Sequence, residues 1–229
     1  MSNLIEKTYS YSPASEAYRM LRTNLQFSSI SREVKVIAVT SPAPGEGKST
    51  TVCNYALSLS KSGKRVMIID CDLRKPKVHM KFKISNFTGL TNVLLEECSV
   101  DQALSVVDEN LEVLTSGTIP PNPAEILGSN RMKDFLAKTK LQYDLIILDT
   151  PPILVVTDGQ VLSSIADGVL LVVESRKTTR DSVLKAKGQL MNVNANILGI
   201  VLNKCDIGNR KSYDYYYTYS SKKKKPCGR

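Results

Sequence analysis

Short, nearly continuous apolar runs alternate along the chain with segments in which apolar residues recur at helical spacing. The apolar runs have the length of buried strands and cover residues 34–40, 65–70, 111–115, 143–149, 168–174 and 197–203. Helices are predicted at 12–29, 48–61, 89–107, 123–140, 157–165 and 179–193. Buried strands separated by helices predict an α/β fold, in which one mostly parallel sheet has helices on both faces. Ligands of such sheets bind at the carboxyl ends of the strands.

The first of these strands leads into a Gly/Pro-rich turn and then into a helix, in the sequence VKVIAVTSPAPGEGKST. Backbone N–H groups in this turn and at the helix N-terminus can face an anion, and the helix dipole favours negative charge. Lys48 supplies a cation, and the Ser49 hydroxyl suits Mg²⁺. The residues predicted to bind the cofactor ATP are Pro44, Gly45, Glu46, Gly47, Lys48, Ser49 and Thr50. The segment therefore predicts a P-loop NTPase-type domain with ATP and Mg²⁺ as cofactors.

This loop departs from the usual pattern G-x-x-x-x-G-K-[ST] at one position. Pro42 stands where the first glycine is expected. The fixed φ of proline, and not the freedom of glycine, is therefore expected to set the first turn.

Two other strands run into aspartates at their carboxyl ends. Asp70 and Asp72 end the sequence IIDCD, and Asp149 ends LIILD. A carboxylate at the tip of a buried strand is costly unless it is solvated, paired or bound to a cation. The second sequence is of the Walker B type, in which the aspartate holds Mg²⁺ directly or through water. Phosphoryl transfer needs positioning, charge neutralisation and a carboxylate to take a proton, so the predicted catalytic residues are Lys48, Asp70, Asp72 and Asp149.

The last strand ends in Asn203-Lys204-Cys205-Asp206, which resembles the guanine-recognition motif N-K-x-D of small GTPases. No GTPase switch feature is identifiable elsewhere in the chain. We therefore expect Asn203 to contact adenine, and GTP stays open as an alternative.

Composition limits the class of protein further. A chain of 229 residues with 42% hydrophobic residues can bury one sizeable core. No apolar run approaches the ~18 residues of a membrane span, and the N-terminus lacks a signal-peptide core, so a soluble, cytoplasmic protein is expected. Five scattered cysteines predict neither a disulfide framework nor a zinc site, and the single histidine, His79, leaves little room for Ser-His-Asp chemistry.

The net charge of +9 is concentrated at the C-terminal end and in a second cluster between Arg74 and Lys83. Such charge suits acidic partners, but no nucleic-acid partner is expected, because no nucleic-acid-binding fold motif accompanies it. The C-terminal segment also holds five of the ten tyrosines within seven positions, in the sequence YDYYYTY. These candidate phosphorylation sites are Tyr213, Tyr215, Tyr216, Tyr217 and Tyr219.

The sequence predicts that the chain has three parts: an N-terminal segment with an oligomerisation helix (1–30), a nucleotide-binding domain (31–208) and a flexible tail (209–229).

The tail suggests a charge-based mechanism. Residues 210–229 contain seven basic residues and one acidic residue, and each phosphotyrosine adds roughly −1.5 to −2 charges. Phosphorylation of all five tyrosines would reverse the sign of the tail. A tail that docks in a neighbour's acidic site would then be repelled, and an assembly of subunits would loosen.

Taken together, these motifs resemble those of the bacterial tyrosine kinases that regulate capsular and exopolysaccharide synthesis, specifically the cytoplasmic kinase subunit of Gram-positive type. PGEGKST resembles the Walker A motif of that family, IIDCDLR its Walker A′, LIILDTPP its Walker B, EAYRMLR its oligomerisation motif and the chain end its tyrosine cluster. The resemblance covers essentially the whole chain. It implies an autophosphorylating protein-tyrosine kinase that transfers the γ-phosphate of ATP to tail tyrosines of neighbouring subunits and to other proteins.

The resemblance also implies roles for individual residues. Ser49 or Thr50, together with Asp70 and Asp149, would bind Mg²⁺, and either Asp70 or Asp72 would activate the acceptor hydroxyl. Glu16, Arg19 and Arg22 would contact neighbouring subunits in a ring, although their spacing also suits an intrahelical ion pair. A membrane-spanning activator would complete the nucleotide site with its cytoplasmic tail and recruit the kinase to the inner face of the plasma membrane.

Two other functions stay open. The chain could be a partner-stimulated ATPase switch like MinD and ParA, but such proteins carry a signature lysine five positions before the Walker lysine, where this chain has Ala43. It could also be a scaffold that binds nucleotide only to assemble.

Overall fold

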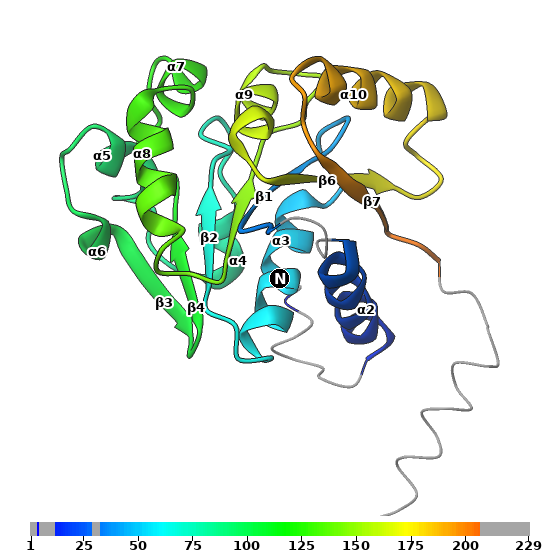
Figure 1. Ribbon diagram of the computed structural model, residues 1–229, viewed down its shortest axis with the longest axis horizontal. Helices are drawn as coiled ribbons and strands as arrows, with labels where there is room; N and C mark the ends of the chain where they lie inside the picture. The colour runs from blue at the N-terminus through cyan, green and yellow to red at the C-terminus, as the bar shows by residue number, and fades with distance from the viewer. Residues whose placement is uncertain (1–3, 5–11, 29–32, 207–229) are drawn as a thin grey trace, which may run out of the picture.

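A seven-stranded sheet forms the centre of the molecule, shown in Figure 1. The computed structural model describes residues 4, 12–28 and 33–206. The strand order is β3-β4-β2-β5-β1-β6-β7, and every neighbouring pair is parallel except β3 and β4. The strands are β1 (Val36–Thr40), β2 (Val66–Asp70), β3 (Leu104–Asp108), β4 (Leu111–Leu114), β5 (Leu145–Asp149), β6 (Gly168–Glu174) and β7 (Ile197–Asn203). The predicted α/β fold with a mostly parallel sheet is confirmed.

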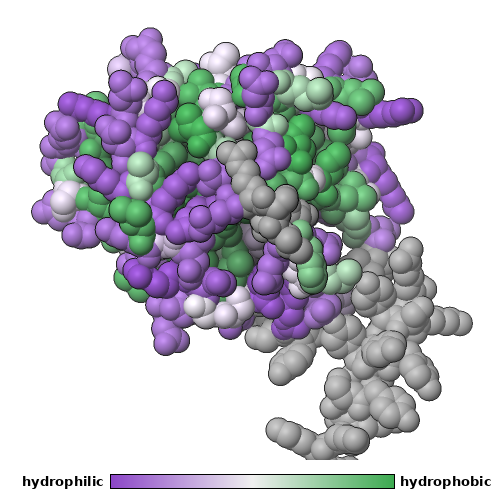
Figure 2. Space-filling model, in the orientation of Figure 1, coloured by the Kyte–Doolittle hydropathy of each residue, from purple (hydrophilic) through white to green (hydrophobic). Residues whose placement is uncertain are grey.

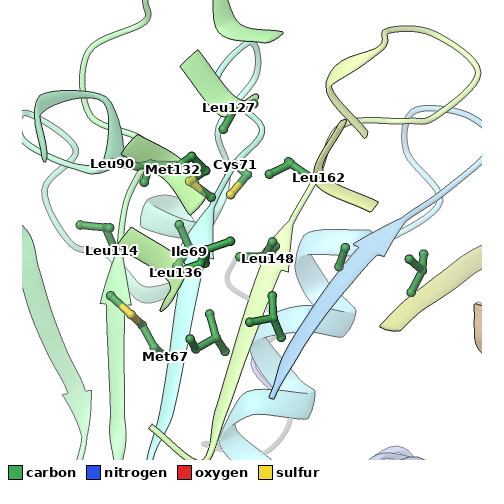
Figure 3. Close-up of a cluster of buried hydrophobic side chains, with 14 of the residues drawn as sticks. Met67, Ile69, Cys71, Leu90, Leu114, Leu127, Met132, Leu136, Leu148 and Leu162 are labelled. Carbon is green, nitrogen blue, oxygen red and sulfur yellow. The ribbon is translucent and has the colours of Figure 1, made fainter. Parts of the chain in front are cut away.

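Helices cover both faces of this sheet, as predicted. The helices are α2 (Pro13–Ser28), α3 (Lys48–Ser60), α4 (Val78–Phe82), α5 (Leu90–Leu94), α6 (Val100–Ala103), α7 (Pro123–Leu127), α8 (Asn130–Thr139), α9 (Asp158–Ile165) and α10 (Arg180–Asn192). One apolar cluster joins the sheet to α2, α3 and α4, and a second joins the opposite face to α5, α7, α8, α9 and α10. Figure 3 shows part of the second cluster, where Met67, Ile69 and Leu148 of the sheet lie near Met132 and Leu136 of α8.

Buried apolar strands explain why the sheet forms where the sequence predicts it. All five residues of β1, of β2 and of β5 are buried, which is the pattern of central strands covered on both faces. Outside the sheet, hydrophilic residues cover most of the face shown in Figure 2, with apolar areas between them.

Two predicted helices are wrong in their extent. The segment predicted as one helix at 89–107 forms α5, α6 and the edge strand β3 instead. Ser99 starts α6 anew through a capping box with Gln102, and the chain from Leu104 then pairs antiparallel with β4. The helix predicted at 123–140 is divided at Gly128, after which Ser129 accepts a hydrogen bond from the N–H of Met132 and starts α8.

Within the described part of the chain, no helix is both long and apolar enough to span a membrane. The four cysteines that lie there, Cys53, Cys71, Cys98 and Cys205, are free thiols. The predicted division of the chain at residues 30 and 208 stays a prediction, and the tail tyrosines lie outside the described residues.

Candidate active site

The phosphate-binding loop lies between β1 and α3, at the carboxyl edge of the sheet. Gly45 and Gly47 have φ values of 84° and 99°, a conformation that other residues adopt only with strain. Gly47 is the N-cap of α3, so the unpaired N–H groups at the start of this 13-residue helix face the loop. Lys48 is 7% exposed, and it makes no ion pair with any residue that the structure describes. The loop thus presents donors and a cation to an anion.

The end of β7 holds this loop from the side. The Asn203 Nδ2 donates a hydrogen bond to the Glu46 carbonyl oxygen over 2.9 Å, and the Lys204 Nζ donates to the Gly45 carbonyl oxygen over 2.9 Å. A Cβ atom at Gly47 would lie 1.9 Å from the Asn203 Nδ2, so only glycine fits there. Asn203 was predicted to contact adenine, and the structure brings its amide against the loop. Lys204 was not predicted as a site residue, although the N-K-x-D motif contains it.

Glu46 contributes to the framework of the loop through its side chain. Its carboxylate is buried and accepts hydrogen bonds from the Ala43 N–H over 3.0 Å and from the Thr178 hydroxyl. The Thr178 hydroxyl oxygen in turn accepts a hydrogen bond from the Glu174 N–H over 2.8 Å. The loop is therefore tied to the segment after β6 as well as to β7.

The two strand-end carboxylates face each other across neighbouring strands, because Asp70 of β2 is in register with Asp149 of β5. The Asp70 Oδ2 accepts hydrogen bonds from the N–H groups of Lys77 and Val78 at 3.0 and 2.9 Å. Burial raises the pKa of Asp70 well above its usual value, and the nearby Asp149 raises it further. Through its hydrogen bonds to Lys77 and Val78, Asp70 fixes the course of the chain between β2 and α4.

Asp149 differs from Asp70 in the hydrogen bonding of its carboxylate. It is fully buried, and neither of its carboxylate oxygens has a hydrogen-bond partner among the described residues. Burial raises the pKa of Asp149 to about 6, while the Lys48 charge and the Ser49 hydroxyl oppose the rise. A buried carboxylate with free oxygens is costly unless a cation or a donor completes its surroundings.

These residues fit a Mg²⁺ ion that takes most of its ligands from elsewhere. No cluster of three or more His, Cys, Asp or Glu side chains able to hold a metal occurs in residues 4, 12–28 and 33–206. Mg²⁺ at nucleotide sites is bound by one or two protein oxygens, with phosphates and waters as the remaining ligands. The free Asp149 oxygens and the Ser49 hydroxyl, which affects the pKa of Asp149, match that donor set.

Asp72 differs from the other two aspartates because it is only partly buried and lines the cavity above the loop. Burial raises the pKa of Asp72, and the charges of Lys48 and Lys77 are among the groups that lower it. A carboxylate that lines the cavity and has a raised pKa can accept a proton from a bound hydroxyl group.

The cavity has a volume of about 300 Å³. Its polar floor is Gly45, Gly47, Lys48, Ser49 and Thr50, and Pro151, Pro152, Val155 and Val156 supply an apolar wall. The charged side chains that line it are Lys48, Arg74, Lys75, Lys77, Lys81, Lys204 and one acid, Asp72. The charged lining of the cavity is therefore mostly basic, which does not favour docking of the unphosphorylated basic tail there. The tail lies outside the described residues, and its docking in a neighbour's site stays a prediction.

Arg74 links this cavity to the opposite wall. Its guanidinium donates two hydrogen bonds to the carboxylate of Asp158, from Nε over 2.8 Å and from NH2 over 3.1 Å. Asp158 starts α9 and is fully buried, whereas 44% of the Arg74 side chain is exposed. The hydrogen bonds to Asp158 raise the pKa of Arg74. The pair connects the chain after β2 to the chain after β5.

The three residues of the proposed oligomerisation motif lie on α2, and one of them faces its own subunit. The Arg19 guanidinium contacts the Glu16 carboxylate over 2.9 Å, three positions apart on the helix. The Arg22 NH1 donates to the Ser58 carbonyl oxygen of α3 over 2.6 Å. The intrahelical pair left open by the sequence is thus present, and a contact with neighbours stays a prediction.

The fold and this site define a P-loop NTPase-type domain. Residues 34–197 match the family model described as AAA domain. The chain is 46% identical to tyrosine-protein kinase YwqD of Bacillus subtilis, over 94% of this chain and 92% of the relative. It also superposes on the kinase domain of Escherichia coli tyrosine kinase ETK with a TM-score of 0.84 and 30% identity, over 91% of this chain and 84% of that chain. The chain belongs to the bacterial tyrosine-protein kinase family, which confirms the predicted enzyme class.

The alternative of a MinD-like switch is disfavoured by the same comparisons. The septum site-determining protein MinD from Pyrococcus horikoshii, complexed with Mg-ADP, has a TM-score of 0.63 and 20% identity, over 79% of this chain and 76% of that chain. At 20% identity this similarity is evidence for a shared fold alone.

Proposed function

We propose that the chain transfers the γ-phosphate of ATP to tyrosines of its own C-terminal tail on neighbouring subunits, and to other proteins. The observation that carries this proposal is the meeting of three unlike groups at one site. Lys48 and Asp72 line the cavity. The buried Asp149 has free carboxylate oxygens and lies close enough to Lys48 and Ser49 for both to lower its pKa. Membership of the tyrosine-kinase family supports the choice of a phenol as acceptor.

Each group then has a distinct role. The N–H groups of residues 45–50 and the Lys48 ammonium bind the triphosphate, in the loop that Asn203 and Lys204 hold in place. Asp149 and Ser49 would hold Mg²⁺, which when bound would neutralise phosphate charge. Asp70 was predicted to share this role, but its Oδ2 already accepts two backbone hydrogen bonds, so we assign it to positioning the segment that carries Asp72.

The transfer step is a displacement at the γ-phosphorus. The phenol oxygen of the acceptor forms the new bond to phosphorus as the bond to the bridging β,γ-oxygen breaks, and ADP leaves with that oxygen. We assign Asp72 as the group that takes the phenol proton, because it lines the cavity and its pKa is raised. The choice that the sequence left open between Asp70 and Asp72 thus falls on Asp72.

The biological setting follows from the family. The kinase would act in capsular or exopolysaccharide synthesis, form a ring through Glu16, Arg19 and Arg22, and be recruited to the inner face of the plasma membrane by a membrane-spanning activator. The activator's cytoplasmic tail would complete the nucleotide site.

One experiment separates this function from its competitors. The full chain is incubated with ATP and Mg²⁺, with and without a cytoplasmic activator fragment, and phosphotyrosine at Tyr213, Tyr215, Tyr216, Tyr217 and Tyr219 is mapped by mass spectrometry. A kinase labels these positions, and Lys48→Met abolishes the labelling. A partner-stimulated ATPase would release phosphate without labelling the tail, and a scaffold would do neither.

A further inference from the structure

Three lysines on one side of the cavity have no partner in the site described so far. Lys75, Lys77 and Lys81 line the cavity together with Asp72, and none of them forms an ion pair with a residue that the structure describes. Lys75 and Lys77 are exposed and Lys81 is partly buried. The segment that carries them is held in place, because the N–H groups of Lys77 and Val78 donate to the buried Asp70. We call Lys75, Lys77 and Lys81 the basic wall.

The position of the basic wall relative to the phosphates identifies its task. In the proposed function the triphosphate binds along residues 44–50. Lys204 lies on the β7 side of this loop, and the segment after β2 lies on the other side. Since Asp72 is proposed to take the proton of the acceptor, the acceptor hydroxyl must lie beside Asp72. The basic wall lines the cavity together with Asp72, so it would border the acceptor.

We propose that the basic wall binds a phosphotyrosine that neighbours the acceptor tyrosine in the same peptide segment, so that one phosphorylated residue promotes phosphorylation of the next. Five tyrosines within seven positions place a phosphate one to six residues from any remaining acceptor. A phosphate ester carries roughly −1.5 to −2 charges and three acceptor oxygens, which suits several ammonium groups. The inference rests on the proposed kinase function and reverses the repulsion suggested by the sequence, because the cavity surface is basic.

The test measures binding apart from turnover. In a full-length chain with its five tail tyrosines changed to Phe, the affinity for two labelled heptapeptides, YDYYYTY and the same peptide phosphorylated at its third tyrosine, is measured by fluorescence anisotropy with a non-hydrolysable ATP analogue and Mg²⁺. The phosphopeptide should bind roughly tenfold more tightly at low salt, and the advantage should shrink at 0.5 M salt through screening. Equal or weaker binding of the phosphopeptide overturns the proposal.

A matched pair of variants locates the effect. Lys75→Gln with Lys81→Gln should remove most of the advantage of the phosphopeptide. Lys133→Gln with Lys187→Gln removes the same charge from exposed positions on α8 and α10 and should leave the advantage intact. An advantage that survives the first pair, or is lost equally in both, overturns the assignment to the basic wall.

Turnover separates this inference from the proposed function. With ATP, kcat/KM for the phosphopeptide should exceed that for the unmodified peptide, and the ratio should fall toward one in Lys75→Gln with Lys81→Gln. Phosphorylation of both peptides at equal kcat/KM refutes the basic wall and leaves the kinase standing. If neither peptide is phosphorylated even with an activator fragment, the proposed function itself fails.

Discussion

At the scale of single residues, the three aspartates of the site look alike in sequence and differ in what surrounds them. Asp149 is buried with two free oxygens, and its raised pKa of about 6 means that its charge opposes folding of the protein without Mg²⁺ and nucleotide. Because the folded-state pKa lies above that of the unfolded chain, the native state holds more protons between pH 4 and 6. Stability should fall as pH rises through this window.

Asp149→Asn should therefore stabilise the metal-free and nucleotide-free protein at pH 7.5, by about 1–3 kcal/mol, while abolishing tail phosphorylation. The measurement is urea unfolding at pH 7.5 and at pH 4. The gain should disappear at pH 4, where Asp149 is already protonated. A variant that is less stable than the parent at pH 7.5 would contradict the account.

Asp70→Asn provides the matched control. One Asp70 oxygen accepts two backbone N–H groups and the other faces the Asp72 N–H at 3.3 Å. An amide in place of the carboxylate turns one acceptor into a donor and leaves a backbone group without a partner, which costs about 1–3 kcal/mol. Burial raises the pKa of Asp70 as well, so loss of its charge offsets part of this cost. At pH 7.5 Asp70→Asn should therefore stabilise the protein less than Asp149→Asn does.

All three aspartates could be predicted as site residues, since each follows a buried apolar strand. The different role of each could not be predicted from the sequence. That difference depends on the N–H groups of Lys77 and Val78, which reach Asp70 only after the chain has turned into α4. The contact of Lys204 with Gly45 joins residues 159 positions apart, and no local pattern reports it.

At the scale of elements, the bidentate contact between Arg74 and Asp158 fastens the segment after β2 to α9. Arg74→Ala would leave the fully buried Asp158 without its cation, so we expect a loss of about 2–4 kcal/mol in urea unfolding. Arg74→Lys should recover only part of this loss, because an ammonium cannot reproduce the two parallel hydrogen bonds. Lys185→Ala, which removes an exposed contact with Asp181 on α10, is the control and should cost much less than Arg74→Ala. Equal losses in Arg74→Ala and Lys185→Ala would show that Asp158 does not need its partner.

On helix α2, effects of a mutation on subunit stability must be separated from effects on ring assembly. Arg22 donates to the Ser58 carbonyl of α3, so Arg22→Ala should destabilise the subunit itself, by about 1–2 kcal/mol. Arg19→Ala breaks a partly exposed pair with Glu16 worth only a few tenths of a kcal/mol. Arg19→Ala is therefore the milder probe of assembly: it should lower the oligomer mass in light scattering, and its urea unfolding curve shows whether the stability of the subunit has changed. A ring that persists in Arg19→Ala but is lost in Arg22→Ala would point to subunit stability instead.

Some helices and strands could be predicted from the sequence pattern and others could not. Central strands were predictable because they are apolar throughout, whereas the edge strand β3 is not: Val106 is 72% exposed, and its pairing with β4 is decided by the turn at 109–110. The helices predicted at 89–107 and 123–140 have the right periodicity, but Ser99 and Ser129 each cap a new helix inside them. Both serines have the extended backbone of an N-cap residue, so no helix can run through them, and periodicity alone does not reveal this.

At the scale of the whole molecule, the strand order bears on whether the tail is phosphorylated within a subunit or between subunits. The tail follows β7, at one edge of the sheet, whereas Asp72 and the basic wall follow β2, four strand positions away. At about 4.8 Å per position this separation is roughly 19 Å, with the phosphate-binding loop of β1 between them. Tyr219 lies thirteen positions after Asp206, a length of chain that could span roughly 45 Å, so reach alone does not decide the question.

From the strand order we expect a bound triphosphate to obstruct a subunit's own tail on its way from β7 to Asp72, and we expect a tail from an adjacent copy to enter from the β2 side. We therefore expect Lys48→Met, with its tail intact, to be phosphorylated by an active chain whose five tail tyrosines are Phe. Mass spectrometry of the mixture measures it, and labelling per chain should rise with total protein concentration. The parent protein alone is the control. Each subunit would phosphorylate itself if two results were found together: the initial labelling per chain of the parent does not depend on protein concentration, and Lys48→Met is not labelled in the mixture.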